Sequence, residues 1–348
     1  MTITQSHENE ALLVLEKEAK KLEECLPKAD FMGCNKKFQL VRYQDYWHLD
    51  KHYIKNTYTF QKQFQAQDSD FIISSIPKTG TTWLKSLLFA VVNRVHYPNT
   101  RENHPILSGH PHDLVYRLEN GIYGEFYGEF GKDNNLCPST LDDIPSPRLF
   151  STHVPYTSLP ESIKKSECRI IFITRNPLDS LVSQWHFYTK TAKNLYGEDF
   201  KPYSLEDYFK NFMDGKILYG PFFEHAIEYW KQSLERPHKV LFLKYEDLKD
   251  DPTLQLKRLA EFVGMPFSPQ EEGGGVIKDI IELCSIKNLK ELDVNKNGVS
   301  YTGLKTKDFF RKGEVGDWTN YFTPLMVEKL NVLMQQKLEG TGLSFKLA

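Results

Sequence analysis

The stretch from Phe71 to Lys85 reads FIISSIPKTGTTWLK, and it decides the fold. An apolar, β-branched run stops at Pro77, and a short loop with a lysine, a glycine and three threonines follows. Residues 83–94 then place apolar side chains at helical spacing. A strand, a tight loop and a helix in this order aim backbone N–H groups and a helix N-terminus at one point. The stretch therefore predicts an anion site.

Two interpretations of this loop compete. It is not a Walker A motif, because Lys78 precedes Gly80 and the spacing Gly-x4-Gly-Lys-Ser/Thr is missing. An ordinary strand-to-helix turn with a threonine N-cap would account for the hydroxyl groups alone. The added positive charge of Lys78 favours a phosphate site.

Composition narrows the class of protein. The chain has 348 residues, 40% of them hydrophobic and 26% charged, which is typical of a soluble globular protein. A net charge of −2 gives no global attraction to nucleic acid or to an anionic membrane. The five cysteines are scattered without a Cys-x-x-Cys pair, and no signal-peptide pattern opens the chain. We expect a cytosolic protein without a metal and without nucleic-acid or membrane partners.

The order of elements predicts the fold class. Four apolar runs, at residues 70–76, 148–151, 168–174 and 240–244, resemble buried strands. Their continuous apolarity favours a parallel sheet that is covered on both faces. Helical stretches separate them, so we predict an α/β fold with one parallel β-sheet flanked by helices on both faces. Ligand sites in such folds lie beyond the C-terminal ends of the strands.

The organisation of the chain suggests one main domain. Residues 1–35 are predicted to form an N-terminal helical arm, and residues 36–348 the domain itself. Segments 120–147 and 295–316 read as long loops, which often form lids or binding elements. The many aromatic residues of segment 36–67 fit either an ordinary core or the wall of a ligand pocket.

Three basic or polar groups follow the predicted strands or stand near the C-terminus. Arg175 directly follows the third run, where its guanidinium could hold a phosphate bidentately or pair with Asp179 at i, i+4. The segment around Arg311 fits a phosphate clamp, since two adjacent cations precede a glycine between aromatic residues. His153 follows the second run and is a candidate general base, although a structural histidine is the alternative. The pair His110 and His112 is weak evidence for a metal.

Five blocks in the same order resemble the cytosolic sulfotransferase family of the sulfotransferase 1 type, and its plant branch in particular. The blocks are Pro77–Trp83 (PKTGTTW), Thr152–Tyr156 (THVPY), Arg175–Pro177 with Ser183, Lys244–Leu248 (KYEDL) and Arg311–Trp318 (RKGEVGDW). The similarity runs from about residue 40 to about residue 340. It implies a P-loop nucleotide-kinase-like fold and residues 36–348 as the sulfotransferase domain.

The resemblance also implies a reaction and a set of site residues. The reaction is the transfer of a sulfuryl group from 3′-phosphoadenosine 5′-phosphosulfate (PAPS) to an acceptor hydroxyl, with 3′-phosphoadenosine 5′-phosphate (PAP) as product and no metal. His153 matches the catalytic base, and Lys78 would stabilise the leaving oxygen. The matched cofactor-binding residues are Lys78, Thr79, Gly80, Thr81, Thr82 and Trp83 for the 5′-phosphate, Arg175, Ser183, Arg311, Lys312 and Gly313 for the 3′-phosphate, and Tyr245 and Ser285 for the adenosine.

The acceptor is expected to be a small apolar or aromatic plant metabolite. The resemblance to the plant branch suggests flavonoids, steroids or brassinosteroids, hydroxyjasmonates and desulfo-glucosinolates as candidate acceptors. Tyr156, Trp185, Phe187 and Tyr188 are candidates for the pocket wall, and each could instead belong to the core. A catalytically inactive PAPS- or PAP-binding protein is the alternative function, and a kinase or hydrolase ranks below it for want of a Mg²⁺ motif.

The chain departs from the family pattern at two places. Many animal members have a lysine two residues before the catalytic histidine, where this chain has Ser151. The C-terminal dimer signature is degraded, with Pro324 where valine is usual. Because proline removes a backbone donor, we expect a monomer.

Overall fold

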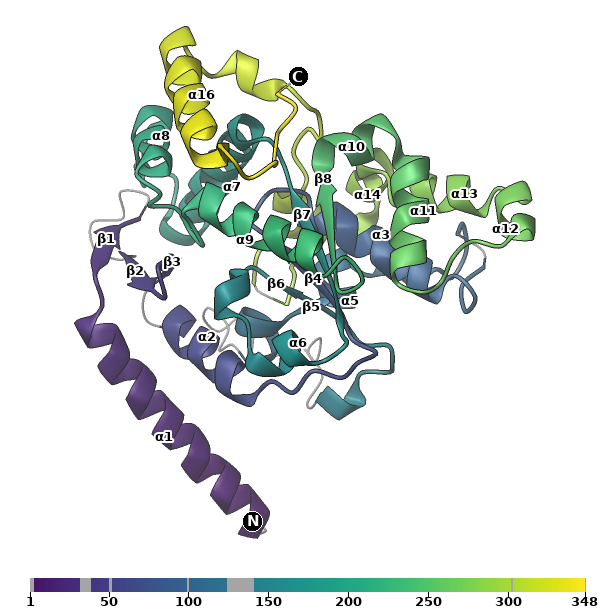
Figure 1. Cartoon of the computed structure of the whole chain (residues 1–348), viewed down its shortest axis with the longest axis horizontal. Helices are drawn as coiled ribbons and strands as arrows, with labels where there is room; N and C mark the ends of the chain where they lie inside the picture. The colour runs from purple at the N-terminus through teal and green to yellow at the C-terminus, as the bar shows by residue number, and fades with distance from the viewer. Residues whose placement is uncertain are drawn as a thin grey trace.

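The computed structural model describes residues 3–31, 39–49, 52–98, 100–123, 141–301 and 303–347. A five-stranded parallel sheet forms its centre, with the strand order β5-β6-β4-β7-β8. Figure 1 shows this sheet surrounded by helices. The strands are β4 (Phe71–Ser75), β5 (Tyr116–Arg117), β6 (Leu149–Thr152), β7 (Arg169–Thr174) and β8 (Val240–Lys244).

The apolar runs feed two separate cores. Side chains of a strand point alternately to opposite faces, so Ile72 packs into one core and Ile73 into the other. Ile170 and Ile171 divide in the same way on β7. The four predicted strands are confirmed to within one residue at each end. The two-residue strand β5 was missed, because so short a segment has no apolar run.

Helices cover both faces, which confirms the predicted single-domain α/β class. The first core is closed by α2 (His52–Gln63), α6 (Glu161–Lys165), α7 (Pro177–Tyr196), α8 (Leu205–Met213), α9 (Phe222–Glu235) and α16 (Pro324–Leu338). The second core is closed by α3 (Thr81–Asn93), α10 (Tyr245–Asp250), α11 (Pro252–Phe262), α13 (Val276–Leu283) and α14 (Ile286–Glu291). Shorter elements are α4 (Pro105–Ser108), α5 (Pro111–Leu114), η1 (Leu118–Ile122), η3 (Leu141–Asp143), η4 (Tyr156–Ser158), α12 (Pro269–Gly273), α15 (Asp293–Asn297), η5 (Thr306–Phe309) and η6 (Asp317–Asn320).

A small antiparallel sheet precedes the large one and was not predicted. It consists of β1 (Lys28–Asp30), β2 (Gln39–Tyr43) and β3 (Tyr46–Leu49). Gln44 and Asp45 form the two-residue turn of its hairpin, with φ of 49° and 68°. Positive φ at both positions is typical of a type I′ turn, whose twist suits a hairpin.

The N-terminal helix α1 (Ile3–Cys25) extends away from the body in Figure 1. It contacts α2 through an ion pair of Glu16 with Lys55 and a hydrogen bond from the Tyr58 hydroxyl to Glu18. The predicted N-terminal arm thus contains a helix. The domain boundary at residue 35 stays a prediction. The pairing of β1 with β2 joins residues on the two sides of that boundary. No helix in the described ranges is long and apolar enough to cross a membrane.

Candidate functional site

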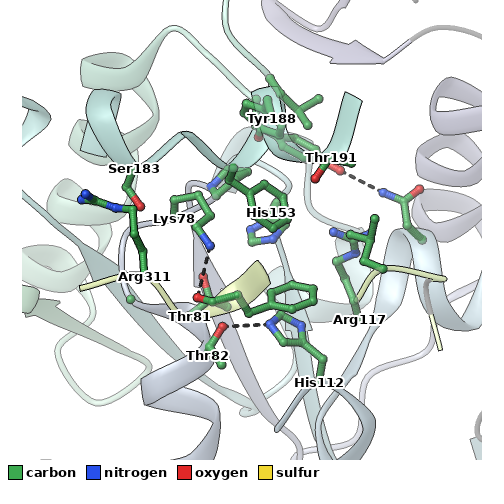
Figure 2. Close-up of a pocket in the computed structure, with 18 of the residues that line it drawn as sticks. Lys78, Thr81, Thr82, His112, Arg117, His153, Ser183, Tyr188, Thr191 and Arg311 are labelled. Atoms are coloured by element: carbon green, nitrogen blue, oxygen red, sulfur yellow. Dashed lines mark hydrogen bonds between the residues drawn. The ribbon is translucent and has the colours of Figure 1, made fainter. Parts of the chain in front are cut away.

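One large cavity opens at the C-terminal edge of the parallel sheet. The residues that end or follow four neighbouring strands line it: Lys78 after β4, His153 after β6, Arg175 after β7 and Tyr245 after β8. The predicted site residues that line the cavity are Lys78, Gly80, Thr81, Thr82, Trp83, His153, Arg175, Ser183, Tyr245, Arg311 and Gly313. Figure 2 shows Lys78 and His153 facing one space, with Arg311 on one side of it and Arg117 on the other.

The loop after β4 has a backbone that requires glycine. Gly80 has a φ of 118°, and a Cβ there would lie 2.8 Å from Ile173 Cδ1 and 2.9 Å from Tyr245 Cδ2. Both contacts are too close for an alanine, so the loop can approach β7 and the start of α10 only with glycine. The Thr79 hydroxyl donates to the carbonyl oxygens of Ile76 and Ile173, at 2.8 and 3.0 Å, and faces the strand ends instead of the cavity.

Lys78 is a cation in an apolar surrounding. Its Nζ donates to the carbonyl oxygen of Phe309 at 3.3 Å and lies 4.1 Å from the centroid of the Phe187 ring. Burial, together with the charges of Arg311 and Arg175 and against the opposing effect of Asp308, lowers the pKa of Lys78 to about 7. A bound anion would stabilise the protonated form of this lysine.

The ring of His153 is held in one tautomer. Its Nδ1 lies 2.7 Å from the carbonyl oxygen of Ser75, which can only accept, so Nδ1 carries the proton and donates. The neutral ring then has its lone pair on Nε2. Burial and, next in size, the charge of Arg117 hold the pKa of His153 well below its ordinary value. The neutral imidazole, which can accept a proton, is therefore the resting form.

A second group of cations, formed by Arg175, Arg311 and Lys312, lies where α7 meets the segment 309–318. Arg175 donates to the carbonyl oxygen of Glu314 and pairs with Asp179 at 3.1 Å. Asp179 also accepts from the backbone N–H groups of Gly316 and Trp318, at 2.8 and 3.1 Å. Arg175 thus forms the i, i+4 pair and also lines the cavity, while its phosphate-holding role stays a prediction.

Arg311 and Lys312 share one carboxylate. Both donate to Asp317; partial burial opposes ionisation of this acid, but the hydrogen bonds from Lys312 and Arg311 hold its pKa at about 2. Arg311 lines the cavity, whereas Lys312 is not among the lining residues. Ser285 also lies outside the lining, and its hydroxyl caps α14 by accepting from the Asn288 N–H at 3.1 Å.

Several donors of lining residues have no hydrogen-bond partner within the described part of the chain. On the side of Arg311 they are Trp83 Nε1, Arg175 Nε, Tyr245 OH and Arg311 Nε. Buried donors of this kind normally have a partner. Tyr245 also packs its ring under the Arg175 guanidinium, at 4.5 Å, and edge-on to Trp83. This half of the cavity therefore suits a ligand with acceptor atoms and a flat ring.

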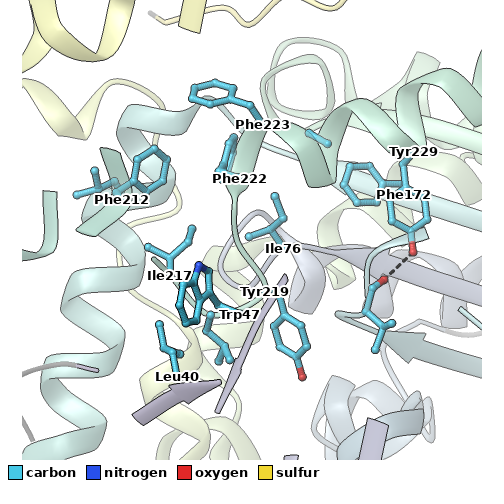
Figure 3. Close-up of a cluster of buried hydrophobic side chains, with 14 of the residues drawn as sticks. Leu40, Trp47, Ile76, Phe172, Phe212, Ile217, Tyr219, Phe222, Phe223 and Tyr229 are labelled. Atoms are coloured by element: carbon cyan, nitrogen blue, oxygen red, sulfur yellow. Dashed lines mark hydrogen bonds between the residues drawn. The ribbon is translucent and has the colours of Figure 1, made fainter. Parts of the chain in front are cut away.

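The sequence did not point to three residues around His153. Glu119 is fully buried and accepts from the His153 backbone N–H at 3.0 Å. Tyr219 packs its ring 5.6 Å from the imidazole, and it reaches the site from the hydrophobic cluster that also contains Trp47 and Ile217 (Figure 3). Arg117 lines the cavity from β5. Arg117 lies on a strand of only two residues, and Tyr219 has a φ of 61° outside any helix or strand. Neither therefore leaves a periodic pattern in the sequence that could reveal it.

The histidine pair after residue 109 takes part in a hydrogen-bond chain. His112 Nε2 lies 3.0 Å from the Thr82 hydroxyl, and its Nδ1 lies 3.0 Å from Lys85 Nζ. Lys85 donates in turn to the carbonyl oxygen of Val115 at 2.8 Å. The chain fixes the first turn of α3 at the anion loop. No group of three or more potential metal ligands occurs among the residues that the structure describes.

The candidates for the acceptor wall divide between cavity and core. Phe187 and Tyr188 line the cavity, as does Tyr53 from segment 36–67. Trp185 and Tyr156 do not line it; the Trp185 indole donates to the Tyr203 carbonyl and Tyr156 packs edge-on against Tyr229. The loop 295–310 contributes Gly303, Leu304, Phe309 and Phe310. Phe38 and most of the loop 120–147 lie outside the described residues.

Comparison with known sequences gives consistent matches. Residues 68–342 match the sulfotransferase domain. Cytosolic sulfotransferase 5 of Arabidopsis thaliana is 43% identical over 334 residues, which cover 95% of this chain and 97% of that protein. Cytosolic sulfotransferase 6 of the same plant is 44% identical over 312 residues, with 88% and 89% covered. The names of these relatives agree with the cytosolic location predicted from the sequence.

Solved structures are similar as well. A crystal structure of an Arabidopsis thaliana protein, provisionally described as a steroid sulphotransferase, superimposes with a TM-score of 0.70 at 34% identity, covering 94% of each chain. Mouse sulfotransferase SULT7A1, solved in complex with PAP, superimposes with a TM-score of 0.64 at 25% identity, covering 86% of this chain and 94% of that one.

Proposed function

Because the chain belongs to the sulfotransferase family, we propose that it moves the sulfuryl group of PAPS to a hydroxyl of a small apolar or aromatic metabolite, with His153 as the base. The class of enzyme and the small-molecule acceptor follow from the family. The one observation that carries the finer proposal is the shared cavity of Lys78 and His153. Lys78 stands on the anion loop, and the imidazole beside it is neutral with Nδ1 committed to Ser75.

The residues present fit a nucleotide with two separate phosphates. The N-terminus of α3 and Lys78 form one anion position, since a helix N-terminus and a cation both favour negative charge. Ser183, Arg175 and Arg311 form the other. The unpartnered donors of Arg175 and Arg311 are then available for the second phosphate, and Tyr245 and Trp83 for the ring system.

The proposed chemistry divides between two side chains. PAPS, when bound, supplies an activated sulfuryl group. His153 Nε2 takes the proton from the acceptor hydroxyl as that oxygen attacks in line. Lys78 offers its ammonium to the oxygen that keeps the electrons of the broken bond. Thr81 and Thr82 stand at the start of α3. Their hydroxyl and backbone N–H groups would hold the phosphate of PAPS that binds at this helix N-terminus.

The acceptor half of the cavity is largely aromatic. Phe31, Tyr53, Phe187 and Tyr188 line it together with Leu49. Such walls suit flat or fused-ring alcohols and phenols such as flavonoids and steroids. Hydroxyjasmonates and desulfo-glucosinolates are further candidates that the family resemblance suggests. The loop 295–310 contributes to this wall and is proposed to take part in acceptor selection.

The competing function is a protein that binds PAPS or PAP without catalysis. Incubation with sulfur-labelled PAPS and a panel of phenols and sterols separates the two, because only the enzyme releases a labelled conjugate. Binding of PAP without any conjugate across the panel would favour the binding protein. Release of phosphate from ATP would favour the hydrolase alternative.

We also propose that the protein is a monomer, because the family's C-terminal dimer signature is degraded around Pro324; the missing backbone donor of this proline is not itself the reason. Pro324 stands at the first turn of α16, behind the N-cap Thr323, where a proline loses no helical hydrogen bond. The degraded dimer signature is thus part of a normal helix start. Light scattering on the eluted protein tests the mass.

A further inference from the structure

One cation in the cavity has no role in holding the two phosphates. Arg117 ends β5, where it pairs in register with Ser151 of β6, two residues before His153. In Figure 2 it lies on the far side of His153 from Arg311 and Ser183. Lys78, Arg175 and Arg311 already serve the nucleotide half, so the charge of Arg117 belongs to the acceptor half.

Burial opposes the positive charge of Arg117, but Glu119 and then Tyr219 raise the pKa of the guanidinium above its ordinary value. The nearest acid is Glu119, whose Oε1 lies 3.8 Å from Arg117 Nε, beyond hydrogen-bond distance. That same oxygen accepts from the His153 N–H at 3.0 Å and from the Tyr219 hydroxyl at 3.4 Å. Within the described chain, Arg117 Nε is buried without a hydrogen-bond partner.

The guanidinium of Arg117 is buried, and its ion pair with Glu119 is not a hydrogen bond. The neighbouring cavity wall includes Leu49, which offers no partner for a charge. A guanidinium in such a place is well suited to hold a planar oxyanion with two parallel hydrogen bonds. A purely structural role beside Glu119 would leave the buried Nε donor unused.

We propose that the acceptor carries a carboxylate that Arg117 binds, while its hydroxyl is directed at His153. The proposal rests on the function proposed above and names its substrate class: hydroxylated monocarboxylic acids with an apolar skeleton. A single guanidinium, already shared in part with Glu119, matches one negative charge better than the two of a phosphate monoester.

Other polar atoms of this half fit such a ligand. The hydroxyls of Tyr188 and Thr191 and the Oδ1 of Asn56 belong to lining residues and have no hydrogen-bond partner among the described residues. Figure 2 shows Tyr188 and Thr191 on the same side of the cavity as Arg117. An acid with further hydroxyl or carbonyl groups would satisfy them.

The test compares matched acceptors. Turnover with saturating PAPS is measured for p-coumaric acid and lithocholic acid, each beside its methyl ester and beside a hydroxyphenyl phosphate, in the wild type, Arg117→Gln and Arg117→Lys. We expect kcat/KM of the wild type to favour acid over ester, and Arg117→Gln to reduce that acid-to-ester ratio by about 10-fold to 100-fold, mainly through KM. Arg117→Lys should restore part of the ratio, because it keeps the charge. Arg42→Gln, an exposed arginine on β2, should keep the wild-type ratio.

Each outcome decides between the proposals. Equal turnover of acid and ester by the wild type, or an unchanged ratio in Arg117→Gln, would overturn the carboxylate assignment while sulfuryl transfer stands. Faster turnover of the hydroxyphenyl phosphate than of the acids would overturn the proposal that Arg117 selects a ligand with a single negative charge. If no acceptor is turned over, the function proposed above fails, and calorimetric binding of acid and ester to the PAP-bound protein decides the Arg117 proposal by itself. Thermal unfolding of each variant confirms that it is folded.

Discussion

His153 Nδ1 donates to the carbonyl oxygen of Ser75 at 2.7 Å, and Ser75 is the last residue of the strand that leads into the Lys78 loop. The strand that positions the anion loop therefore also sets the tautomer of the neighbouring imidazole. Because β4 is the central strand of the sheet, a shift of its C-terminal end would displace both groups. The proposed base and the proposed leaving-group cation thus share one rigid support.

The first prediction concerns the base. His153→Ala should lower kcat by about 10²-fold to 10⁴-fold, the usual contribution of a positioned base. PAP affinity should stay near that of the wild type, since His153 is not part of either phosphate position. Radiolabel transfer measures the rate and calorimetry measures the affinity. A variant with near-normal turnover would remove His153 from the mechanism.

The second prediction concerns the pH dependence of PAP binding. The free protein has a pKa of about 7 at Lys78, and a bound anion raises it, so binding takes up a proton above pH 7. PAP affinity should then fall as pH rises from about 7, by up to about tenfold per pH unit. The fall ends at the pKa of the bound lysine.

The control for this effect is Lys78→Met, which keeps an unbranched side chain, shorter by the terminal nitrogen, and removes its charge. PAP phosphates titrate too, so the quantity to compare is the difference between wild type and variant at each pH, measured by calorimetry from pH 6 to pH 9. The groups that act on Lys78 in the free protein are Arg311, Asp308, Arg175 and Lys190. A difference that is flat across this range would contradict a titrating Lys78.

The third prediction uses two glycines with the same backbone conformation. Gly313 has a φ of 72°, and a Cβ there would lie 2.5 Å from Ile286 Cδ1; Gly342 has a φ of 73° and nothing within 4 Å. Both alanine variants should lose about 1 kcal/mol of unfolding free energy from the left-handed backbone. Only Gly313→Ala should also weaken PAP binding, because the neighbouring Arg311 must shift.

Removal of the obstructing side chain supplies the rescue. The double variant Gly313→Ala, Ile286→Ala should recover most of the lost PAP affinity if the clash with Ile286 is the cause. Chemical denaturation and PAP calorimetry separate stability from binding. Equal PAP affinities in Gly313→Ala and Gly342→Ala would mean that the segment tolerates the contact.

The sequence reveals those parts of the site that follow strong strands. Lys78, His153 and Arg175 each come after an apolar run, so the topology of a parallel sheet is enough to bring them to one edge. It does not reveal where a hydroxyl points. Ser285 caps a helix, and Thr79 hydrogen-bonds to strand ends, because local backbone groups compete for short polar side chains.

Arg117 illustrates a different limit of prediction. Its strand has two residues, and its neighbours in the cavity come from distant segments of the chain. Hydrophobic periodicity needs a longer run than that to be visible. Only the register of β5 against β6 places Arg117 beside Ser151 and so within the acceptor half.

The last prediction concerns Asp179, which joins the two sides of the second phosphate position. It is fully buried, pairs with Arg175 and accepts from the backbone N–H groups of Gly316 and Trp318. Asp179→Ala should leave the buried Arg175 and the two partly buried backbone donors without this partner and lower the unfolding free energy by about 3 to 5 kcal/mol.

The same change should weaken PAP binding more than Asp179→Asn does. Asparagine keeps an acceptor oxygen for one of the two backbone N–H groups but loses the charge that orients Arg175. We expect the order wild type, Asp179→Asn, Asp179→Ala for both the denaturation midpoint and PAP affinity. If Asp179→Ala lost stability but bound PAP as tightly as the wild type, Arg175 would not depend on this carboxylate for its position. In that case the carbonyl oxygen of Glu314, its other partner, would be sufficient to hold the guanidinium at the cavity.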